Sequence, residues 1–192
     1  MSRILAFDTW QEQWGNTDRI LTEEQNESVA MQTFSGLDLT KRIVEAQTDI
    51  DGMTAAKRCW NYQKGGLQWY LPCLMELGVL CAYRDEINKA MKEIGCPDEC
   101  LLPTEDSDET WYWSSSEGSQ VSSWGVYFSY GYFYGYNKYN SYMVRAVAAF
   151  QPSPSLLTGE AKSNDCLHSD EALINMLRER GYKGELTKTL TI

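Results

Sequence analysis

The sequence is short of histidine and of positive charge. It has one histidine, His168, and 17 Lys and Arg against 27 Asp and Glu, for a formal net charge of −10. No nucleic-acid partner is expected, because binding to phosphates needs clustered cations. The same charge disfavours docking on anionic lipid. A single histidine offers no nucleophile–base pair, so we expect no catalytic residues and a protein that is not an enzyme.

Long apolar runs are also missing. No window reaches transmembrane length, so we expect no insertion into a membrane. The apolar residues before Asp8 are too few for a secretory signal, which predicts synthesis in the cytoplasm. A protein that acts outside would leave inside a phage particle or by another route. The site of action, a phage virion or a cell surface, stays open.

Metal-binding patterns are incomplete. The six cysteines are expected to be reduced thiols, because no secretory signal is visible. Cys96 and Cys100 lack a second pair at the spacing of zinc ligands, and His168 is far along the chain. The acidic stretch Glu99–Thr110 suggests calcium, yet the Glu-Pro-Asn and Trp-Asn-Asp motifs of carbohydrate-binding calcium sites are absent. We expect a solvated acidic loop there, and neither metal nor cofactor.

Tyrosine, in contrast, is abundant in one tract. Residues 127–142 comprise seven Tyr, two Phe, two Ser, two Gly, two Asn and one Lys. An ordinary core would hold Val, Ile and Leu, since each buried Tyr needs a partner for its hydroxyl. Tyr supplies rigid contact area, and Ser, Gly and Asn adapt to a ligand, so the composition is typical of a binding surface. A second small aromatic core or an aggregation-prone segment is the alternative.

The flanks of this tract have the period of strands. From Trp124 the residues alternate, so we expect Trp124, Val126 and Phe128 to be buried and Gly125, Tyr127 and Ser129 to be exposed. Met143–Phe150 reads as a second strand. No period is assigned to Tyr130–Tyr142, which is expected to form the connection between the two strands.

Several motifs together resemble a known family. They are WYWSSSE from Trp111, the Trp-x-Val-x-Phe strand from Trp124, a polar run at Asn137-Lys138, VRAVAAF from Val144, and an upstream Trp-Tyr-Leu-Pro followed by Glu-Leu. The chain resembles the variable proteins of diversity-generating retroelements, found in bacteria and their phages. The resemblance covers residues 50–150 well and residues 1–49 weakly. Ala146 and Cys73 depart from it, since Pro and Ser are usual there.

The resemblance implies an α+β, C-type-lectin-like fold, the fold class of the formylglycine-generating enzymes, with two helices, small antiparallel sheets and long irregular loops. It also implies a non-catalytic, hypervariable surface that recognises a receptor, that is, a protein or glycan ligand on a cell surface. In such proteins AAC-type Asn codons scatter to Tyr, Ser, Gly, Asp, His, Phe and others, but never to Lys, Gln, Glu, Trp or Met. The variable region is placed at about 118–143, and the implied ligand-binding residues are Gly125, Tyr127, Ser129, Tyr130, Tyr132, Tyr134, Gly135, Tyr136, Asn137, Tyr139, Asn140 and Tyr142.

The rest of the chain is organised around this tract. Ile4–Phe7 should pair with Val144–Phe150, as first and last strands do in lectin-like folds. Residues 8–35 are expected to be irregular, with Trp10 and Trp14 as anchors. Helices are predicted at 38–47, at 53–63 and, after Pro72, in two parts with apolar faces. Those two faces are Leu74, Leu77, Gly78 and Cys81, then Ile87, Ala90, Met91 and Ile94.

The domain division follows composition. Residues 1–150 are assigned to the ligand-binding domain, 151–168 to a linker rich in Pro and Ser near its start, and 169–192 to a short helix–strand extension. That extension is too small to fold alone, so it docks on the main domain or joins a partner protein.

Two charged residues beside apolar neighbours, Glu117 and Arg145, are expected to brace the site. They would form a partly buried ion pair or bond to the loop backbone, the alternative being two exposed charges. Trp111, Trp113, Trp124 and Phe128 are interpreted as core. A fixed-specificity carbohydrate-binding module is the alternative function, because stacked Tyr faces suit sugar rings.

Overall fold

In the computed structural model, which describes residues 2–15, 18–104 and 110–150, the chain forms one six-stranded sheet and five α-helices. This is an α+β architecture. The strands are β1 (Ser2–Gln13), β2 (Trp69–Tyr70), β3 (Trp111–Glu117), β4 (Ser122–Tyr127), β5 (Tyr132–Asn137) and β6 (Ser141–Phe150). The helices are α1 (Glu27–Ala30), α2 (Gly36–Ala46), α3 (Ala55–Trp60), α4 (Leu74–Ala82) and α5 (Arg84–Glu93), with a short 3₁₀ helix η1 (Asp98–Cys100).

The sheet follows the order β1-β6-β3-β4-β5, and β2 also pairs with β6. β1 and β6 are antiparallel, with Ile4 opposite Ala148 and Leu5 opposite Val147, which confirms the predicted pairing of the first and last strands. β1 continues to Gln13 after a register shift, so the expectation of irregular chain from residue 8 is wrong there. The shift lets the polar residues after Phe7 keep bonding to β6.

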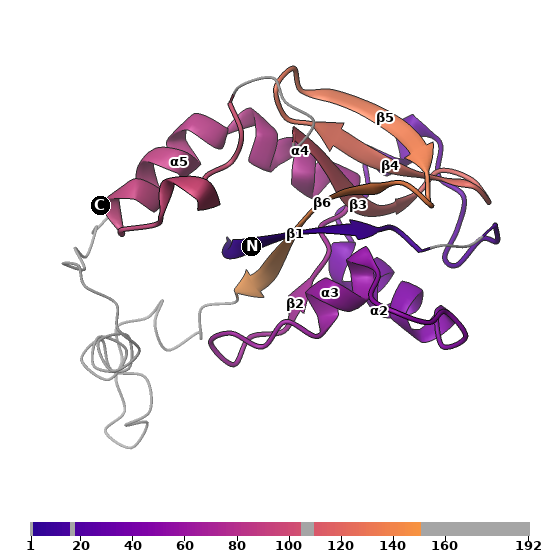
Figure 1. Ribbon diagram of the computed structural model, residues 1–192. Helices are drawn as coiled ribbons and strands as arrows, with labels where there is room; N and C mark the ends of the chain where they lie inside the picture. Colours follow the sequence, from indigo (N-terminus) through magenta and orange to yellow (C-terminus); the bar gives the residue numbers. More distant parts are fainter. Residues whose placement is uncertain (1, 16–17, 105–109, 151–192) are drawn as a thin grey trace, which may run out of the picture.

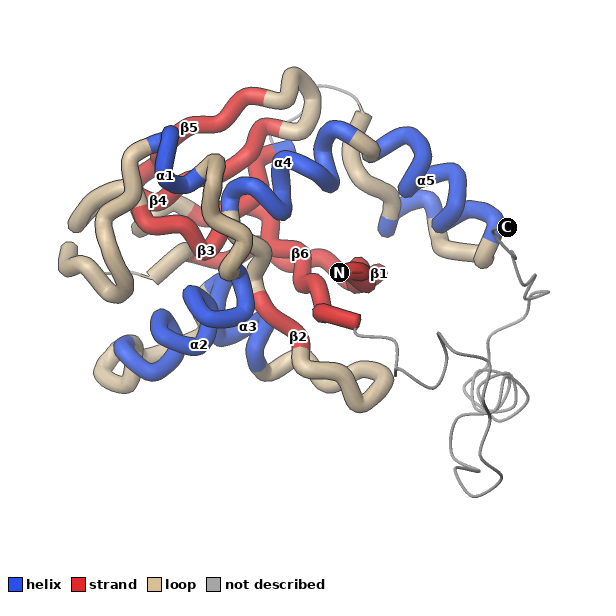
Figure 2. Tube along the Cα trace, turned by 180° about the vertical axis from the view of Figure 1, so that it is seen from behind, coloured by secondary structure: helices blue, strands red, loops and turns tan. Residues whose placement is uncertain are grey.

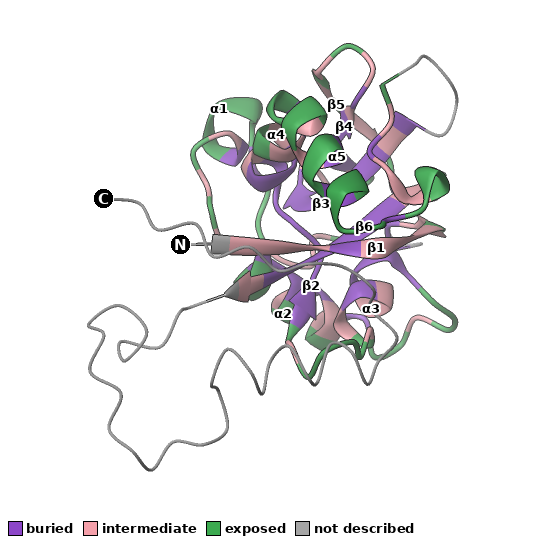
Figure 3. Cartoon of the chain, turned by 90° about the vertical axis from the view of Figure 1, so that its left-hand side faces the viewer, coloured by how far each residue is buried: buried purple, intermediate pink, exposed green. Residues whose placement is uncertain are grey.

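Helices cover both faces of the sheet. Figures 1 and 2 show α2 and α3 on one side and α4 and α5 on the other. On the first side Ile43, Ala55 and Cys59 pack against Trp113 and Val144. On the second side the core is made by α1, α4, β3 and β4, through Ala30, Leu74, Leu77, Tyr112, Val126 and Phe128. Figure 3 shows buried segments, in purple, on the central strands and on parts of the helices that pack against them.

Helix starts match their capping residues. Asn26 Oδ1 accepts a bond from Val29 N at the start of α1, and Thr54 Oγ1 accepts one from Lys57 N at the start of α3. Pro72 lies just before α4, whose cap is Cys73. Gly65 and Gly66 have φ of 67° and 66°, in the turn that follows α3.

The predicted apolar face of α5 is wrong in part. Asn88 and Met91 are buried in this helix, whereas Ala90 is exposed and Ile94 is 56% exposed. The cause is the Asn88 side chain, which donates to Leu102 O and accepts from Leu102 N, both at 2.8 Å. Because both of these hydrogen bonds are made, the amide of Asn88 can be buried without an unsatisfied polar group. The buried face of α5 therefore includes this polar residue in place of Ala90.

The predicted linker 151–168 and extension 169–192 lie outside the described residues, as do positions 105–109 of the acidic loop. In the part that the structure describes, no helix is long and apolar enough to span a membrane. The five cysteines described there are free thiols: Cys59, Cys73, Cys81, Cys96 and Cys100. Burial raises the pKa of Cys73 to about 12, so this thiol stays protonated and unreactive.

One buried carboxylate joins β1, β2 and α4. Glu76 accepts from Arg3 Nη2 at 2.7 Å, from the Tyr70 hydroxyl at 3.0 Å and from Cys73 N at 3.1 Å. Gly36, at the start of α2, leaves room for it, because a Cβ there would lie 2.2 Å from Glu76 Oε2. Close packing around this group therefore requires glycine at position 36.

Replacing Gly36 by Ala is expected to lower the free energy of unfolding by about 1–3 kcal/mol, the usual range for overpacking. The new methyl would also lie 2.7 Å from the backbone nitrogen of Cys73, which cannot move aside. Gly135→Ala is the matched control, since its Cβ would meet nothing closer than Ser122 Oγ at 3.8 Å. Equal urea midpoints for the two variants would contradict the packing argument.

Candidate ligand-binding site

The hairpin of β4 and β5 carries most of the tyrosines of the tract 127–142. Its register sets Tyr127 opposite Tyr132, Gly125 opposite Tyr134 and Ser123 opposite Tyr136. Directly opposed residues of an antiparallel pair point to the same face, so Tyr132, Tyr134 and Tyr136 stand beside Tyr127. With Tyr130 and Tyr142, which contact them through their rings, they form one aromatic area. We call these six residues the Tyr surface: Tyr127, Tyr130, Tyr132, Tyr134, Tyr136 and Tyr142.

The Tyr surface is graded from exposed to half-buried. Tyr130, Tyr132 and Tyr134 are 58%, 63% and 60% exposed. Beneath them, Trp111 stacks on Tyr127 with ring centroids 4.5 Å apart and meets the edge of Tyr136 at 4.5 Å. The outer rings are thus open to a ligand, while the inner ones are held by a half-buried indole.

This aromatic area lies on the same face of the sheet as α2 and α3, beside the part that these helices cover. Tyr136 and Tyr142 pack against the same apolar cluster as Trp113. The ring of Tyr142 lies 5.0 Å from that of Trp113, edge to face. The Tyr surface therefore continues a rigid core instead of extending from a free loop.

Two strands were expected around the tract, and three are present. Tyr132–Asn137 forms β5, so the expectation of a connection without a period from Tyr130 to Tyr142 is wrong. The missed signal is Tyr at every second position, 132, 134 and 136, which is the alternation of a strand with one aromatic face. The remaining turns are short.

The predicted burial pattern from Trp124 to Ser129 is correct for Val126 and Phe128, wrong for Gly125, and not met in full at Trp124, Tyr127 and Ser129, which are half-buried. Val126 and Phe128 are fully buried, as predicted. Gly125 is buried and not exposed, because a Cβ there would lie 2.8 Å from the carbonyl oxygen of Tyr112 in β3. Trp124 is only half-buried, and its indole N–H donates to Gln25 O at 2.7 Å.

Not every predicted site residue belongs to the Tyr surface. Gly135 stands opposite Trp124 in the register and so lies on the other face of the hairpin. Ser129 is half-buried instead of exposed, as is Tyr127 within the Tyr surface. Asn137, Tyr139 and Asn140 form the turn into β6, where Asn137 Oδ1 accepts from Tyr139 N at 3.0 Å.

A buried ion pair braces this end of the sheet. Lys138 Nζ lies 2.5 Å from Glu117 Oε1, and both side chains are fully buried. The ammonium also donates to Arg19 O at 3.0 Å and Gln120 O at 2.8 Å, and it lies 4.9 Å from the ring centre of Trp14. Burial lowers the pKa of Lys138, and the bond to Glu117 acts in the opposite direction.

Glu117 holds the loop before α1 to the same centre. Its carboxylate accepts from Leu21 N at 3.0 Å, from Thr22 N at 2.8 Å and from Thr22 Oγ1 at 2.9 Å. Glu117 thus bonds to loop backbone as predicted, but the loop is the one before α1 and not the Tyr-rich connection. Its cationic partner is Lys138, which sequence reasoning missed because the two residues are 21 positions apart without a shared motif.

Arg145 is also buried, but it is not the partner of Glu117. Its Nε donates to Ala6 O at 2.5 Å and its Nη2 lies 3.9 Å from Met91 Sδ. Burial lowers the pKa of this guanidinium. Arg145 therefore ties β6 to β1 beneath α5 and has no direct contact with the Tyr surface among the interactions described.

The phenol of Tyr136 is neutral at ordinary pH. Burial raises the pKa of Tyr136, and the neighbouring Tyr142 and Tyr134 raise it further. Neutral phenols offer hydrogen bonds and ring faces to a ligand instead of charge.

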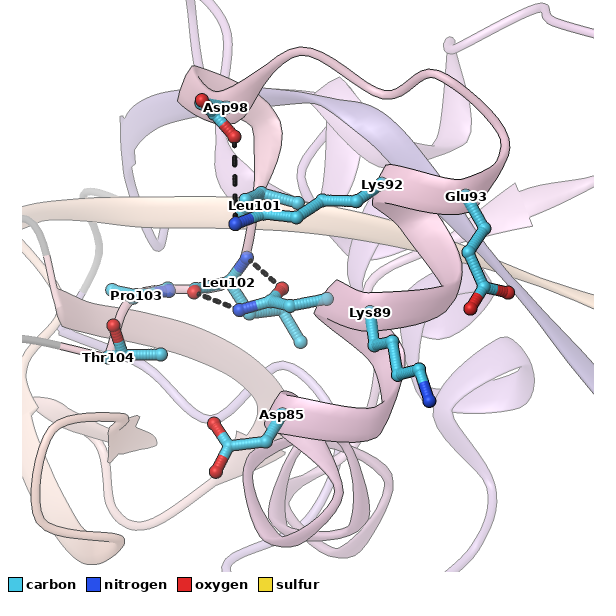
Figure 4. Close-up of a pocket in the computed structure, with 10 residues that line it drawn as sticks. Asp85, Lys89, Lys92, Glu93, Asp98, Leu101, Leu102, Pro103 and Thr104 are labelled. Carbon is cyan, nitrogen blue, oxygen red and sulfur yellow. Dashed lines mark hydrogen bonds and ion pairs between the residues drawn. The ribbon is translucent and has the colours of Figure 1, made fainter.

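The surface of the described residues includes two hollows. One of about 470 Å³ is lined by Glu27, Trp111, Gly131, Tyr132, Phe133, Tyr134 and Tyr136, so most of it belongs to β5. The other, of about 740 Å³, lies between α5 and residues 98–104 and shares no residue with the first (Figure 4). Among the residues that line it, Asn88 is hydrogen-bonded to Leu102, and Lys92 pairs with Asp98 at 3.8 Å. Within the ranges that the structure describes, no group of three or more His, Cys, Asp or Glu is placed to hold a metal.

A family model described as the Lcl C-terminal domain matches residues 9–148, which include all six strands at least in part. Neither the curated proteins nor the solved structures contain a match to the chain.

Proposed function

The chain belongs to the Lcl C-terminal domain family, whose model matches residues 9–148 of its 192, and from that premise we propose that it is a non-catalytic, lectin-like binding protein whose Tyr surface contacts the ligand. The observation that carries this proposal is the exposure of Tyr130, Tyr132 and Tyr134 on a sheet whose other aromatic residues are packed. Leaving three large rings in water costs free energy that burial against a ligand would recover.

We further propose that the fold is C-type-lectin-like and that the surface is diversified by a retroelement. Support comes from Lys138, the only residue from 125 to 142 that belongs to the five types excluded by scatter of AAC codons. It is fully buried in the ion pair with Glu117, where a scaffold residue is needed. The three most exposed residues of the Tyr surface, by contrast, are of a permitted type. The residue of an excluded type thus lies in the scaffold, and the exposed residues of a permitted type lie on the surface.

The nucleotide sequence tests this proposal. We expect a nearby repeat of the segment encoding about 118–143 that differs from it at adenines, next to a reverse-transcriptase gene. The codon of Lys138 should be identical in the two copies, because this residue supports the fold. A gene without such a repeat would refute diversification and leave the binding proposal standing.

A fixed-specificity carbohydrate-binding module is the second candidate. It is favoured by the rings of Tyr130 and Tyr132, which are stacked with centroids 5.7 Å apart and are both exposed, as platforms for sugar rings are. A glycan array decides between the candidates. One sugar class bound alike by several close homologues would support the module, whereas ligands that differ between homologues would support a diversified site.

A receptor on a cell surface is the proposed partner, recognised from a phage virion or from another cell. A protein or glycan ligand fits the neutral, aromatic character of the Tyr surface. The net charge of −10 adds long-range attraction for cationic ligands and none for nucleic acid.

A further inference from the structure

β5 ends the sheet on the side of the Tyr surface. In the strand order β1-β6-β3-β4-β5 it pairs with β4, and no second strand adjoins it within the described residues. Figures 1 and 2 both show it as the outermost strand. One side of its backbone is therefore open.

The pattern of hydrogen bonds between β4 and β5 shows which main-chain groups of β5 face outward. Lys138 N donates to Val121 O at 3.0 Å, and this bond continues the register in which Asn137 is opposite Ser122. Because antiparallel strands bond at alternate residues, Tyr132, Tyr134 and Tyr136 direct their main-chain groups to β4. Phe133 and Gly135 direct theirs to the open side. In the part of the chain that is described, neither makes another main-chain bond outside the sheet.

This edge lacks the usual protection against pairing. Proteins shield an edge strand with charged residues, Pro or a bulge, and the sequence of β5, YFYGYN, has no charge, no Pro and no register shift against β4. β1, at the other end of the sheet, carries Arg3, Asp8 and Glu12 in ion pairs and has a register shift. At the centre of the open edge Gly135 adds no side chain.

We propose that the open edge of β5 takes an extended peptide segment of the ligand as an additional strand, and that this segment carries Lys or Arg. The inference rests on the proposed function and names the partner class as protein. Main-chain bonds to Phe133 and Gly135 would supply affinity that does not depend on the variable side chains, and the neighbouring tyrosines would supply specificity.

The charge of the segment follows from the hollow beside β5. Among the described residues that line it, Glu27 is the one that carries a charge, next to Tyr132, Tyr134 and Tyr136. A Lys or Arg of the added strand would lie between this carboxylate and electron-rich ring faces, which attract cations. A second copy of the chain is disfavoured as occupant, because each copy has a net charge of −10 and would bring the same Glu27 to the contact.

The first test uses a displayed library of random linear 12-residue peptides, selected on the full chain. We expect binders enriched in Lys and Arg. Methylating the backbone nitrogens of a selected peptide one at a time should weaken its binding at least tenfold at every second central position and little at those between. Uniform losses, or a library that yields no binder above background, would overturn the proposal.

The second test separates the edge from the Tyr surface. Gly135→Pro removes an outward N–H while leaving the bonds that Tyr134 and Tyr136 make to β4, and Gly135→Ala keeps it. We expect peptide binding to be at least tenfold weaker for the Pro variant than for the Ala variant. If Tyr132→Ser/Tyr134→Ser loses binding and Gly135→Pro does not, the edge proposal fails and the proposed function stands. If neither substitution affects binding, both fail.

Analytical ultracentrifugation tests the competing occupant. We expect the same sedimentation for the wild-type chain and for Gly135→Pro, without a dimer. A dimer that Gly135→Pro dissociates would overturn the proposal, because a second copy would then hold the edge. If the Pro variant does not fold, the methylation scan still decides the matter, since it alters only the peptide.

Discussion

Replacing Lys138 by Met is expected to lower the free energy of unfolding by about 3–5 kcal/mol, the usual result of leaving one partner of a buried ion pair alone. Glu117 would keep its bonds from Leu21 and Thr22, yet its negative charge would remain buried without a cation. The loss should show in urea unfolding. The Tyr surface should loosen as well, because Lys138 lies between β5 and β6.

Lys41→Met is the matched control, since Lys41 pairs with Glu45 at 3.9 Å with both side chains more than half exposed. Exposed pairs contribute little, so we expect a change of about 0.5 kcal/mol or less. Adding Glu117→Gln to Lys138→Met should restore part of the stability, because it removes the buried charge. Equal losses for Lys138→Met and Lys41→Met would mean that the buried pair does not support the fold.

Trp113→Ala is the second substitution with a large expected effect, about 3–5 kcal/mol. The Trp113 side chain is fully buried, its ring meets that of Tyr142 at 5.0 Å, and its N–H donates to Glu12 O at 3.2 Å. Its loss would leave a cavity under the inner edge of the Tyr surface. Differential scanning calorimetry of the variant should show a clearly lower unfolding temperature.

Tyr132→Ala provides the comparison for Trp113→Ala, because it truncates an aromatic residue of the same sheet that is 63% exposed. Its expected effect is about 0.5 kcal/mol. If Trp113→Ala were as stable as Tyr132→Ala, Trp113 would not be part of the core that stabilises the fold.

Local patterns were enough to predict much of the scaffold. Alternation identified Val126 and Phe128 as buried, and both are fully buried. The pairing of Ile4–Phe7 with Val144–Phe150 came from the resemblance, since no local pattern specifies a partner 140 residues away. The composition of the tract singled out the residues that form the Tyr surface.

What escaped prediction depends on contacts between distant segments. Gly125 is buried because the backbone of Tyr112 approaches it, and Asn88 is buried because Leu102 offers both a donor and an acceptor. Lys138 lies in an exposed-looking polar run, and only the fold brings it to Glu117, Arg19 and Gln120. β5 was missed for another reason, since Phe133 is the one large apolar residue among those that alternate with its tyrosines.

The central claim, that the exposed tyrosines form a ligand-contacting surface and not a second core, is tested most directly by urea unfolding of Tyr132→Ser/Tyr134→Ser beside Trp113→Ala. These tyrosines are 63% and 60% exposed, so the double variant should lose about 1 kcal/mol or less, since exposed substitutions change stability by about 0.5 kcal/mol each. A loss as large as that of Trp113→Ala would show that the tyrosines stabilise the fold as core residues, which contradicts the account.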